Sequence, residues 1–258
     1  MTQVKKKIIP ALALFFLLGS STPNSAQVMD ARFDIYGICG YGIPIGGHAV
    51  AVSQKAEGVW PAITIIEEKD HYLNYGKGLH LEAGVNIKTM DNIKAQISFN
   101  FTRNIPSIKA KYENITSNER NNENNYSTNL FGFKALIIPY FNAFDLIEMY
   151  AGVGIGFFFN KVSIEGDNVV HNEYEGNIKT NPTLAFSSKL GADFPLTDML
   201  SLFGEISFDA MSFKVKSMQT TENPNKITYD KDNNTLDPPP KIPGSNFGLN
   251  IGLRLLIM

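Results

Sequence analysis

Hydrophobic and polar residues alternate one by one along several long segments of the chain. The clearest is the C-terminal segment, where one face carries Asn246, Gly248, Asn250, Gly252 and Arg254 and the other Phe247, Leu249, Ile251, Leu253, Leu255 and Ile257. The same alternation recurs within residues 79–88, 93–103 and 148–160. Because successive side chains of a strand point to opposite faces, a period of two predicts strands with one apolar face.

Extended over the whole chain, this pattern predicts eight strands, at about 31–45, 78–88, 93–105, 127–141, 147–162, 181–194, 200–215 and 245–258. Three of the connections are short turns, whereas four are long, at 46–77, 106–126, 163–180 and 216–244. Short and long connections alternate strictly along the chain. This asymmetry is typical of an outer-membrane barrel, which has short periplasmic turns and long extracellular loops.

The long connections are mostly polar. Residues 114–129 are dense in Asn, Glu and Ser, and residues 222–244 carry Asn, Asp and five prolines. Such stretches are not expected to fold compactly alone, because they bury too little apolar surface. The first connection contains the more apolar piece Val59 to Ile66, which we interpret as a hairpin within a loop, with a ten-stranded barrel as the alternative.

The N-terminus has the features of a secretory signal peptide. Lys5, Lys6 and Lys7 precede an apolar core from Ile8 to Leu18, and small residues follow up to Ala26. The core is too short for a membrane anchor, which needs about 20 apolar residues. We therefore expect cleavage after Ala26, so that residues 1–26 form the signal peptide and 27–258 the mature domain.

No other part of the chain contains a run of 18 apolar residues. Only helices and closed barrels satisfy their own backbone hydrogen bonds in lipid. The sequence therefore predicts an all-β protein, namely a membrane-spanning, antiparallel, up-and-down β-barrel in the cell outer membrane.

A soluble barrel would also alternate, with its apolar face turned inward. Two features favour the opposite arrangement. The apolar face is nearly free of charge, and the other face is rich in glycine, as a crowded lumen requires: Gly84, Gly132, Gly152, Gly154, Gly156, Gly191, Gly248 and Gly252. Aromatic residues near strand ends are expected to form interfacial girdles: Tyr36, Tyr41, Tyr140, Phe141, Tyr150 and Phe194.

The predicted strands contain short segments such as Tyr150-Ala-Gly-Val-Gly-Ile-Gly and Leu202-Phe-Gly-Glu-Ile-Ser-Phe. With these segments and its alternating strands, nearly the whole mature chain resembles the small outer-membrane barrels of the OmpA, OmpX and OmpW type. The resemblance implies contact with outer-membrane lipid and lipopolysaccharide, and insertion by the barrel assembly machinery. Members of this group usually end in an aromatic residue, whereas this chain ends in Met258.

Charged residues lie on the lumenal face of the predicted strands. The residues expected to form a lumenal charge network are Asp34, Glu82, Lys134, Lys189, Glu205 and Arg254, with Lys94, Glu148 and Asp209 on the same face. Counting along the strands from their periplasmic ends predicts one ring segment of alternating sign: Lys189, Glu205, Arg254, Asp34. Eight strands enclose an interior that side chains can fill, so we expect a plugged lumen, with a narrow polar path as the alternative.

The remaining chemistry gives no catalytic, cofactor or metal assignment. Three of the four histidines, His48, His71 and His171, fall in predicted loops. His80 and Glu82 share the lumenal face and could act as a base with its carboxylate, but lumenal hydrogen bonding is the favoured interpretation. The single cysteine, Cys39, excludes an internal disulfide, and a net charge of -2 gives no basic field for nucleic acid.

The sequence thus favours a non-enzymatic surface barrel whose long loops bind an extracellular partner, because loops on a rigid scaffold commonly carry binding functions. A transporter or narrow channel for small solutes and a lipid-modifying enzyme remain the alternatives.

Overall fold

A computed structural model describes residues 33–57, 64–105, 107–114, 122–143, 147–167, 173–220, 227–228 and 241–257. The proposed signal peptide, residues 1–26, lies outside these ranges. Within them, no helix is long and apolar enough to cross a membrane.

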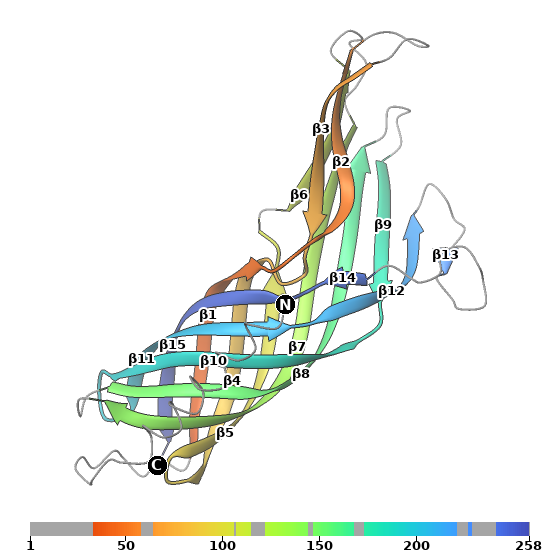
Figure 1. The fold of residues 1–258 in the computed structure, drawn as a ribbon. Helices are drawn as coiled ribbons and strands as arrows, with labels where there is room; N and C mark the ends of the chain where they lie inside the picture. The colour runs from red at the N-terminus through yellow and green to blue at the C-terminus, as the bar shows by residue number, and fades with distance from the viewer. Residues whose placement is uncertain are drawn as a thin grey trace, which may run out of the picture.

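Eight antiparallel strands close into a barrel (Figure 1). They are β1 (Phe33–Pro44), β4 (Gly78–Met90), β5 (Ile93–Arg103), β7 (Asn122–Ala143), β8 (Ile147–Asp167), β10 (Thr183–Pro195), β11 (Leu200–Ala210) and β15 (Asn246–Ile257). The first strand closes against the last, with Phe33 opposite Ile257 and Pro44 opposite Asn246. The predicted eight-stranded barrel is confirmed, and the ten-stranded alternative is wrong.

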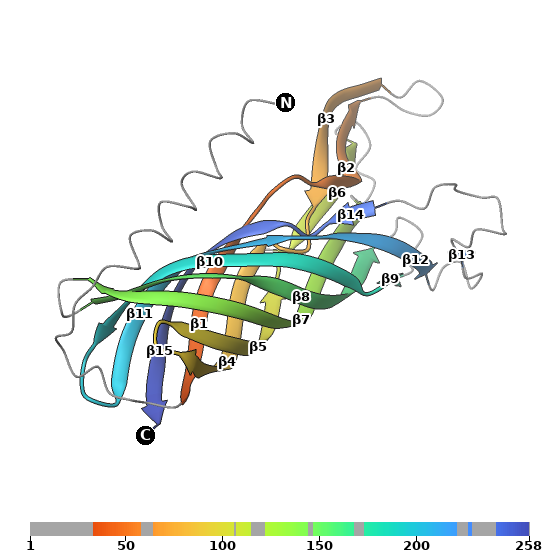
Figure 2. The same ribbon diagram turned by 60° about the horizontal axis from the view of Figure 1, so that its bottom comes forward.

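The remaining strands form an extension beyond one end of the barrel. They are β2 (His48–Glu57), β3 (Thr64–Leu73), β6 (Ile108–Asn114), β9 (Glu173–Thr180), β12 (Ser212–Thr220), β13 (Ile227–Thr228) and β14 (Lys241–Pro243). Together with the upper parts of β7 and β8 they make one sheet, which we call the distal sheet. Figure 2 shows β7 and β8 running without a break from the barrel into this sheet.

The four long connections are therefore more ordered than their polar composition suggested. Residues 122–126, expected to lie in a loop, belong to β7, which pairs with β8 up to Asp167. The reason is that several of these strands carry an apolar, buried face, as at Ile108 of β6, Ile164 of β8 and Ile178 of β9. The hairpin expected around 59–66 is β2 paired with β3, although residues 58–63 lie outside the described ranges.

The strand expected at 200–215 divides at Met211. Its first part, β11, stays in the barrel beside β15, and its second part, β12, pairs with β9 and β14 in the distal sheet. Alternation continues through the break, with Met211, Phe213 and Val215 all buried. The hydrophobic pattern therefore marked both parts as strand but could not reveal the change of partner.

The outer surface of the barrel carries a broad apolar belt. Residues of outward parity on every barrel strand expose large hydrophobic side chains, among them Ile35, Leu81, Phe99, Phe133, Ile155, Phe186, Ile206, Leu249, Ile251 and Leu253. A soluble protein would bury this much apolar surface, whereas lipid hydrocarbon accommodates it.

The expectation of two aromatic girdles is only partly right. Tyr41 and Phe194 are exposed, but Tyr36 and Tyr150 are 3% and 1% exposed and lie in the lumen. Tyr36 lies two residues from Asp34, and Tyr150 lies two residues from Gly152, so each tyrosine points to the same lumenal face as that neighbour. Parity along a strand decides the face, and nearness to a strand end does not override it.

The orientation of the barrel leads to a prediction. The described chain starts and ends at the end with the short turns, which we expect to face the periplasm. Proteinase K added to intact cells should therefore cut within residues 106–126 or 216–244, detected by mass spectrometry of the fragments. Cuts confined to 88–92 or 195–199 would show the inverted orientation.

Candidate functional site: the charged lumen and the distal cavity

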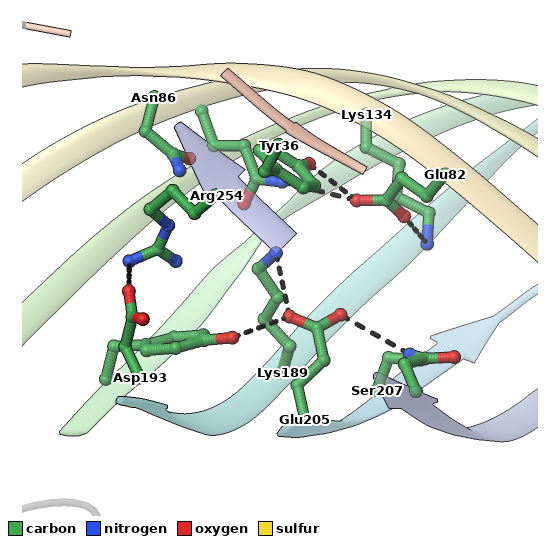
Figure 3. Close-up of polar contacts among 12 residues, drawn as sticks. Tyr36, Glu82, Asn86, Lys134, Lys189, Asp193, Glu205, Ser207 and Arg254 are labelled. Carbon is green, nitrogen blue, oxygen red and sulfur yellow. Dashed lines mark hydrogen bonds and ion pairs between the residues drawn. The ribbon is translucent and has the colours of Figure 1, made fainter. Parts of the chain in front are cut away.

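The barrel lumen holds charged side chains at several levels and joins them in ion pairs. Nearest the short turns, Arg254 of β15 contacts three carboxylates, from Asp34, Glu148 and Asp193. Figure 3 shows the contact with Asp193. Its Nε lies 3.4 Å from Asp34 Oδ1, and its Nη1 lies 3.3 Å from Glu148 Oε1. Lys94 Nζ lies 2.8 Å from Glu148 Oε1 and 3.7 Å from Asp34 Oδ2, so two cations here join three carboxylates.

In the middle of the lumen, Lys189 Nζ lies 3.2 Å from Glu205 Oε2. The Tyr150 hydroxyl donates a hydrogen bond of 2.9 Å to the same carboxylate oxygen, and the Asn250 amide donates one of 3.3 Å to Glu205 Oε1. Both oxygens of this buried carboxylate are therefore satisfied, which offsets the cost of removing it from water.

Closer to the distal sheet, Lys134 Nζ lies between two carboxylates, 3.2 Å from Glu82 Oε2 and 2.9 Å from Asp209 Oδ2. The Tyr36 hydroxyl donates to Glu82 Oε1 at 2.7 Å, and Ser187 Oγ donates to Asp209 Oδ1 at 2.6 Å. These contacts link β1, β4, β7, β10 and β11, so the network ties together strands on several sides of the barrel.

Aromatic rings separate the charged levels. Phe203 packs edge-on against Tyr36 and Tyr150, with centroid separations of 6.0 and 6.5 Å. Arg254 Cζ lies 5.1 Å from the Phe203 centroid, and Lys189 Nζ lies 5.1 Å from the Tyr36 centroid. A cation over an aromatic face is stabilised by the ring quadrupole, so these rings both fill space and hold the cations in place.

The structure brings together only part of the ring segment expected from the sequence. Lys189 contacts Glu205 and Arg254 contacts Asp34, as expected. Glu205 and Arg254 do not share a level, because Glu205 lies opposite Asn250 while Arg254 lies opposite Ser201. The link between the two pairs is therefore wrong. Arg254 instead contacts Asp193, a residue that the sequence analysis missed although it shares the parity of Lys189 and Gly191.

His80 is buried in the lumen beside this network. Its Nε2 lies 3.6 Å from Glu82 Oε2 and 2.9 Å from the Asn100 amide nitrogen. Glu82 is already held by Lys134 and Tyr36, so the arrangement corresponds to lumenal hydrogen bonding. In the part of the chain that the structure describes, no group of three or more His, Cys, Asp or Glu side chains is arranged to hold a metal ion.

Above the charged levels, the lumen is filled by an apolar core that underlies the distal sheet. Its buried members come from both halves of the chain: Leu73, Tyr75, Ile108, Ala110, Tyr126, Leu130, Phe158, Val162, Ile164, Ile178, Ala185, Met211, Phe213, Val215 and Ile242. Tyr75 and Phe213 meet edge-on with their centroids 5.2 Å apart. Burial raises the pKa of the Tyr75 hydroxyl well above its ordinary value, so this group stays neutral.

A cavity of about 460 Å³ lies at the base of the β2–β3 hairpin, and exposed residues such as Asp70 and Tyr72 form part of its lining. Its polar lining comes from β3, the link to β4 and the residues around the start of β6: Asp70, His71, Tyr72, Asn74, Lys77, Ser107 and Lys109. Asn74 fixes this wall, because its amide donates to the carbonyls of Gly46 at 2.8 Å and Ser245 at 3.2 Å. The sequence predicted only a loop in this region and gave no sign of the cavity.

A closed eight-stranded barrel with an exposed apolar belt and a charged lumen defines the class of protein: the chain has the fold of a small outer-membrane β-barrel, and the outer membrane is where such a surface is stable.

Solved structures of this class match the chain at low sequence identity. The outer membrane protein OprG from Pseudomonas aeruginosa matches with a TM-score of 0.50 and 10% identity over 88% of this chain and 96% of its own. A major outer membrane protein from Thermus thermophilus gives a TM-score of 0.49 and 13% identity, with 89% and 100% covered. Neisserial surface protein A gives 0.44 and 10%, with 88% and 98% covered. No protein-family model and no curated protein matches the sequence.

The lumenal network leads to a first prediction about stability. Replacing Glu205 by Ala leaves Lys189 without its carboxylate inside the barrel, which costs about 3–5 kcal/mol for a fully buried pair and less if water enters. Urea unfolding in lipid vesicles should show this loss. The exposed Glu113 on β6 provides the control, since Glu113→Ala should change stability by less than about 0.5 kcal/mol. Equal losses in both variants would contradict a buried network.

A second prediction follows from the space around the lumenal glycines. A Cβ at Gly191 would lie 2.4 Å from Tyr150 Cζ and 2.8 Å from the Gly204 carbonyl oxygen. Gly191→Ala should therefore displace the Tyr150 ring from Glu205 and lower stability by about 1–3 kcal/mol. Gly37 faces outward with nothing within 4 Å of its Cβ position, so Gly37→Ala should be neutral or stabilising in the same assay. A neutral Gly191→Ala would show that Tyr150 does not need this space.

Proposed function

We propose that the protein is a non-enzymatic outer-membrane scaffold that displays the distal sheet outside the cell and binds a partner there. The observation that carries this proposal is the filling of the barrel. Paired charges and aromatic rings occupy its lower part, and an apolar core occupies the part beneath the distal sheet. A molecule that meets this protein from outside is therefore expected to bind on its distal surface.

The cavity beside the β2–β3 hairpin is the binding site that we favour. Tyr72 is 57% exposed on its wall, so it offers an aromatic face to a ligand. Around it stand a carboxylate, an amide and two ammonium groups, from Asp70, Asn74, Lys77 and Lys109. Ligand sites usually combine an apolar surface with a few polar groups that fix orientation. This combination suits a polar, hydroxyl-bearing ligand such as the end of an oligosaccharide.

In this proposal, Ser53 and His71 of the β2–β3 hairpin have a structural role. Ser53 Oγ and His71 Nε2 lie 2.7 Å apart, a separation that a nucleophile and its base also adopt. However, Ser53 Oγ also accepts a hydrogen bond of 2.9 Å from the backbone N–H of Lys111. The pair thereby joins β3 and β2 to β6. Comparison of the lipid A of cells with and without the gene, by mass spectrometry, distinguishes this role from a lipid-modifying activity.

The filled lumen predicts that the protein does not conduct. Purified protein inserted into a planar bilayer should give little or no steady ion current, because paired charges, aromatic rings and an apolar core occupy the lumen. Stable channels of large conductance would contradict the scaffold proposal and favour the transporter alternative.

Binding at the cavity is tested with nanodisc-embedded protein on an array of bacterial and host oligosaccharides. The unmodified chain should bind a subset of them, and Tyr72→Ala should weaken that binding by about tenfold, corresponding to the ~1.4 kcal/mol of a partly exposed aromatic contact. Ile66→Ala is the matched control, because Ile66 is exposed on the same strand but does not line the cavity. Equal effects of both changes, or binding to no member of the array, would argue against this site.

A further inference from the structure

Basic residues stand on the outer surface of the barrel where its apolar belt ends. On β5 the outward series ends in Phe99, Phe101 and then Arg103. On β8 the corresponding series runs from Val153 to Phe159 and then reaches Lys161. In both strands the next outward residue towards the distal sheet is therefore a cation, and it is exposed.

The strand register places these cations in one row across four neighbouring strands. Arg103 lies opposite Asn129 of β7, Asn129 lies opposite Lys161, and Lys161 lies opposite Lys179 of β9. Neighbouring strands are about 4.8 Å apart, so the row extends over roughly 14 Å of the surface. We call Arg103, Asn129, Lys161 and Lys179 the basic rim.

The rim contains cations that face each other without an anion between them. Within the rim, Lys161 and Lys179 are directly opposite. Outside the rim, Lys214 of β12 and Lys241 of β14 also lie opposite each other. Like charges in this position destabilise a sheet. Among the described residues, no carboxylate forms an ion pair with any of these four lysines, whereas Lys94, Lys134, Lys189 and Arg254 in the lumen are all paired.

An aromatic surface lies directly beneath the rim. One residue pair below it, Phe101, Phe131 and Phe159 are aligned in register on β5, β7 and β8, and Phe99, Phe133 and Phe157 form the next row down. These rings contact one another, with centroid separations of 5.2 Å for Phe101–Phe131 and 5.4 Å for Phe99–Phe133. The surface thus offers a cationic row and an apolar area in contact, which matches an amphiphile with an anionic head.

We propose that the basic rim binds the phosphate groups of lipopolysaccharide in the outer leaflet, while the acyl chains lie against the six phenylalanines. A lysine ammonium is a compact charge that suits a phosphate oxygen, and Arg103 offers a planar donor fork at the other end of the row. A phosphate between Lys161 and Lys179 also removes the repulsion between them. A lipid is favoured over a free anion because the rim adjoins the membrane-facing belt. This inference does not depend on the ligand of the distal cavity.

The test uses the full chain purified in neutral detergent and native mass spectrometry to measure lipid binding. The probes are lipid A with both phosphates and the same lipid after dephosphorylation. The unmodified protein should bind the phosphorylated lipid at least about tenfold more tightly than the dephosphorylated lipid, as expected for hydrogen bonds to charged groups. The double variant Lys161→Gln/Lys179→Gln should lose this preference and keep its affinity for the dephosphorylated lipid.

The matched control is Lys55→Gln/Lys69→Gln, which removes the same charge from the β2–β3 hairpin and should retain the preference. A second readout guards against a folding defect. Without lipid A, the rim variant should melt at the same temperature as the unmodified protein or higher, because a repulsive pair has been removed. On the unmodified protein, raising the salt concentration should weaken binding of the phosphorylated lipid more than that of the dephosphorylated one.

Three results would overturn the proposal. The first is equal affinity of the unmodified protein for both lipids, which would mean that only the acyl chains are bound. The second is an equal loss of preference in the control, which would mean that net charge alone acts. The third is displacement of the lipid by inorganic phosphate at the concentration at which lipid A itself binds, which would indicate a site for a free anion.

Discussion

The pairing of charge inside the barrel is the constraint on which the rest of this structure depends. A strand wall that faces lipid must be apolar on the outside, so the charged side chains of the membrane-spanning part point inward. An unpaired charge there would be costly to hold away from water. The lumen meets this requirement with shared partners: Arg254 contacts three carboxylates and Lys134 contacts two. Because these contacts cross between strands far apart in the chain, they also fix how the wall closes.

The crowded lumen explains the glycines of the inner face. The Phe158 ring occupies the space that a side chain would need at Gly132 and Gly156, where a Cβ would lie 2.3 and 2.4 Å from ring carbons. Ile38 fills the equivalent space at Gly252. Large and small residues thus alternate between neighbouring strands. This packing lets an eight-stranded barrel hold aromatic rings and charged side chains at the same levels.

The sequence predicted the features that depend on parity along a single strand. The apolar face of Phe247 to Ile257, the inward direction of Glu82 and Lys134, and the contact of Lys189 with Glu205 across one short turn all follow from a period of two. The contact predictions that failed depended on the stagger between strands that are not joined by a short turn. Leu200 of β11 pairs with Leu255, so Arg254 lies near the end of the barrel, four residues below the level of Glu205. Counting from the chain end could not supply this offset, because the stagger belongs to the closed barrel as a whole.

Several distal strands, such as β6 and β9, escaped recognition for a different reason. Their polar residues outnumber the apolar ones, and only a few positions such as Ile108, Ala110 and Ile178 carry the buried face. Composition therefore suggested loops. The strands with which these segments pair lie in other long connections of the chain: β6 pairs with β2 of the first long connection, and β9 pairs with β12 of the last. The cavity beside the hairpin depends on this assembly, so no local pattern could have indicated it.

The unbroken pair formed by β7 and β8 has a mechanical consequence. Its ladder runs from Glu123 opposite Asp167 in the distal sheet to Ala143 opposite Ile147 at the far end of the barrel. A strand of this length extends about 70 Å, whereas a tilted strand needs only about ten residues to cross the membrane. A pull on the distal sheet along the strands is therefore carried as shear by many hydrogen bonds at once, rather than by one bond after another. Such a joint resists tension, which suits a structure that holds an object at a distance from the cell.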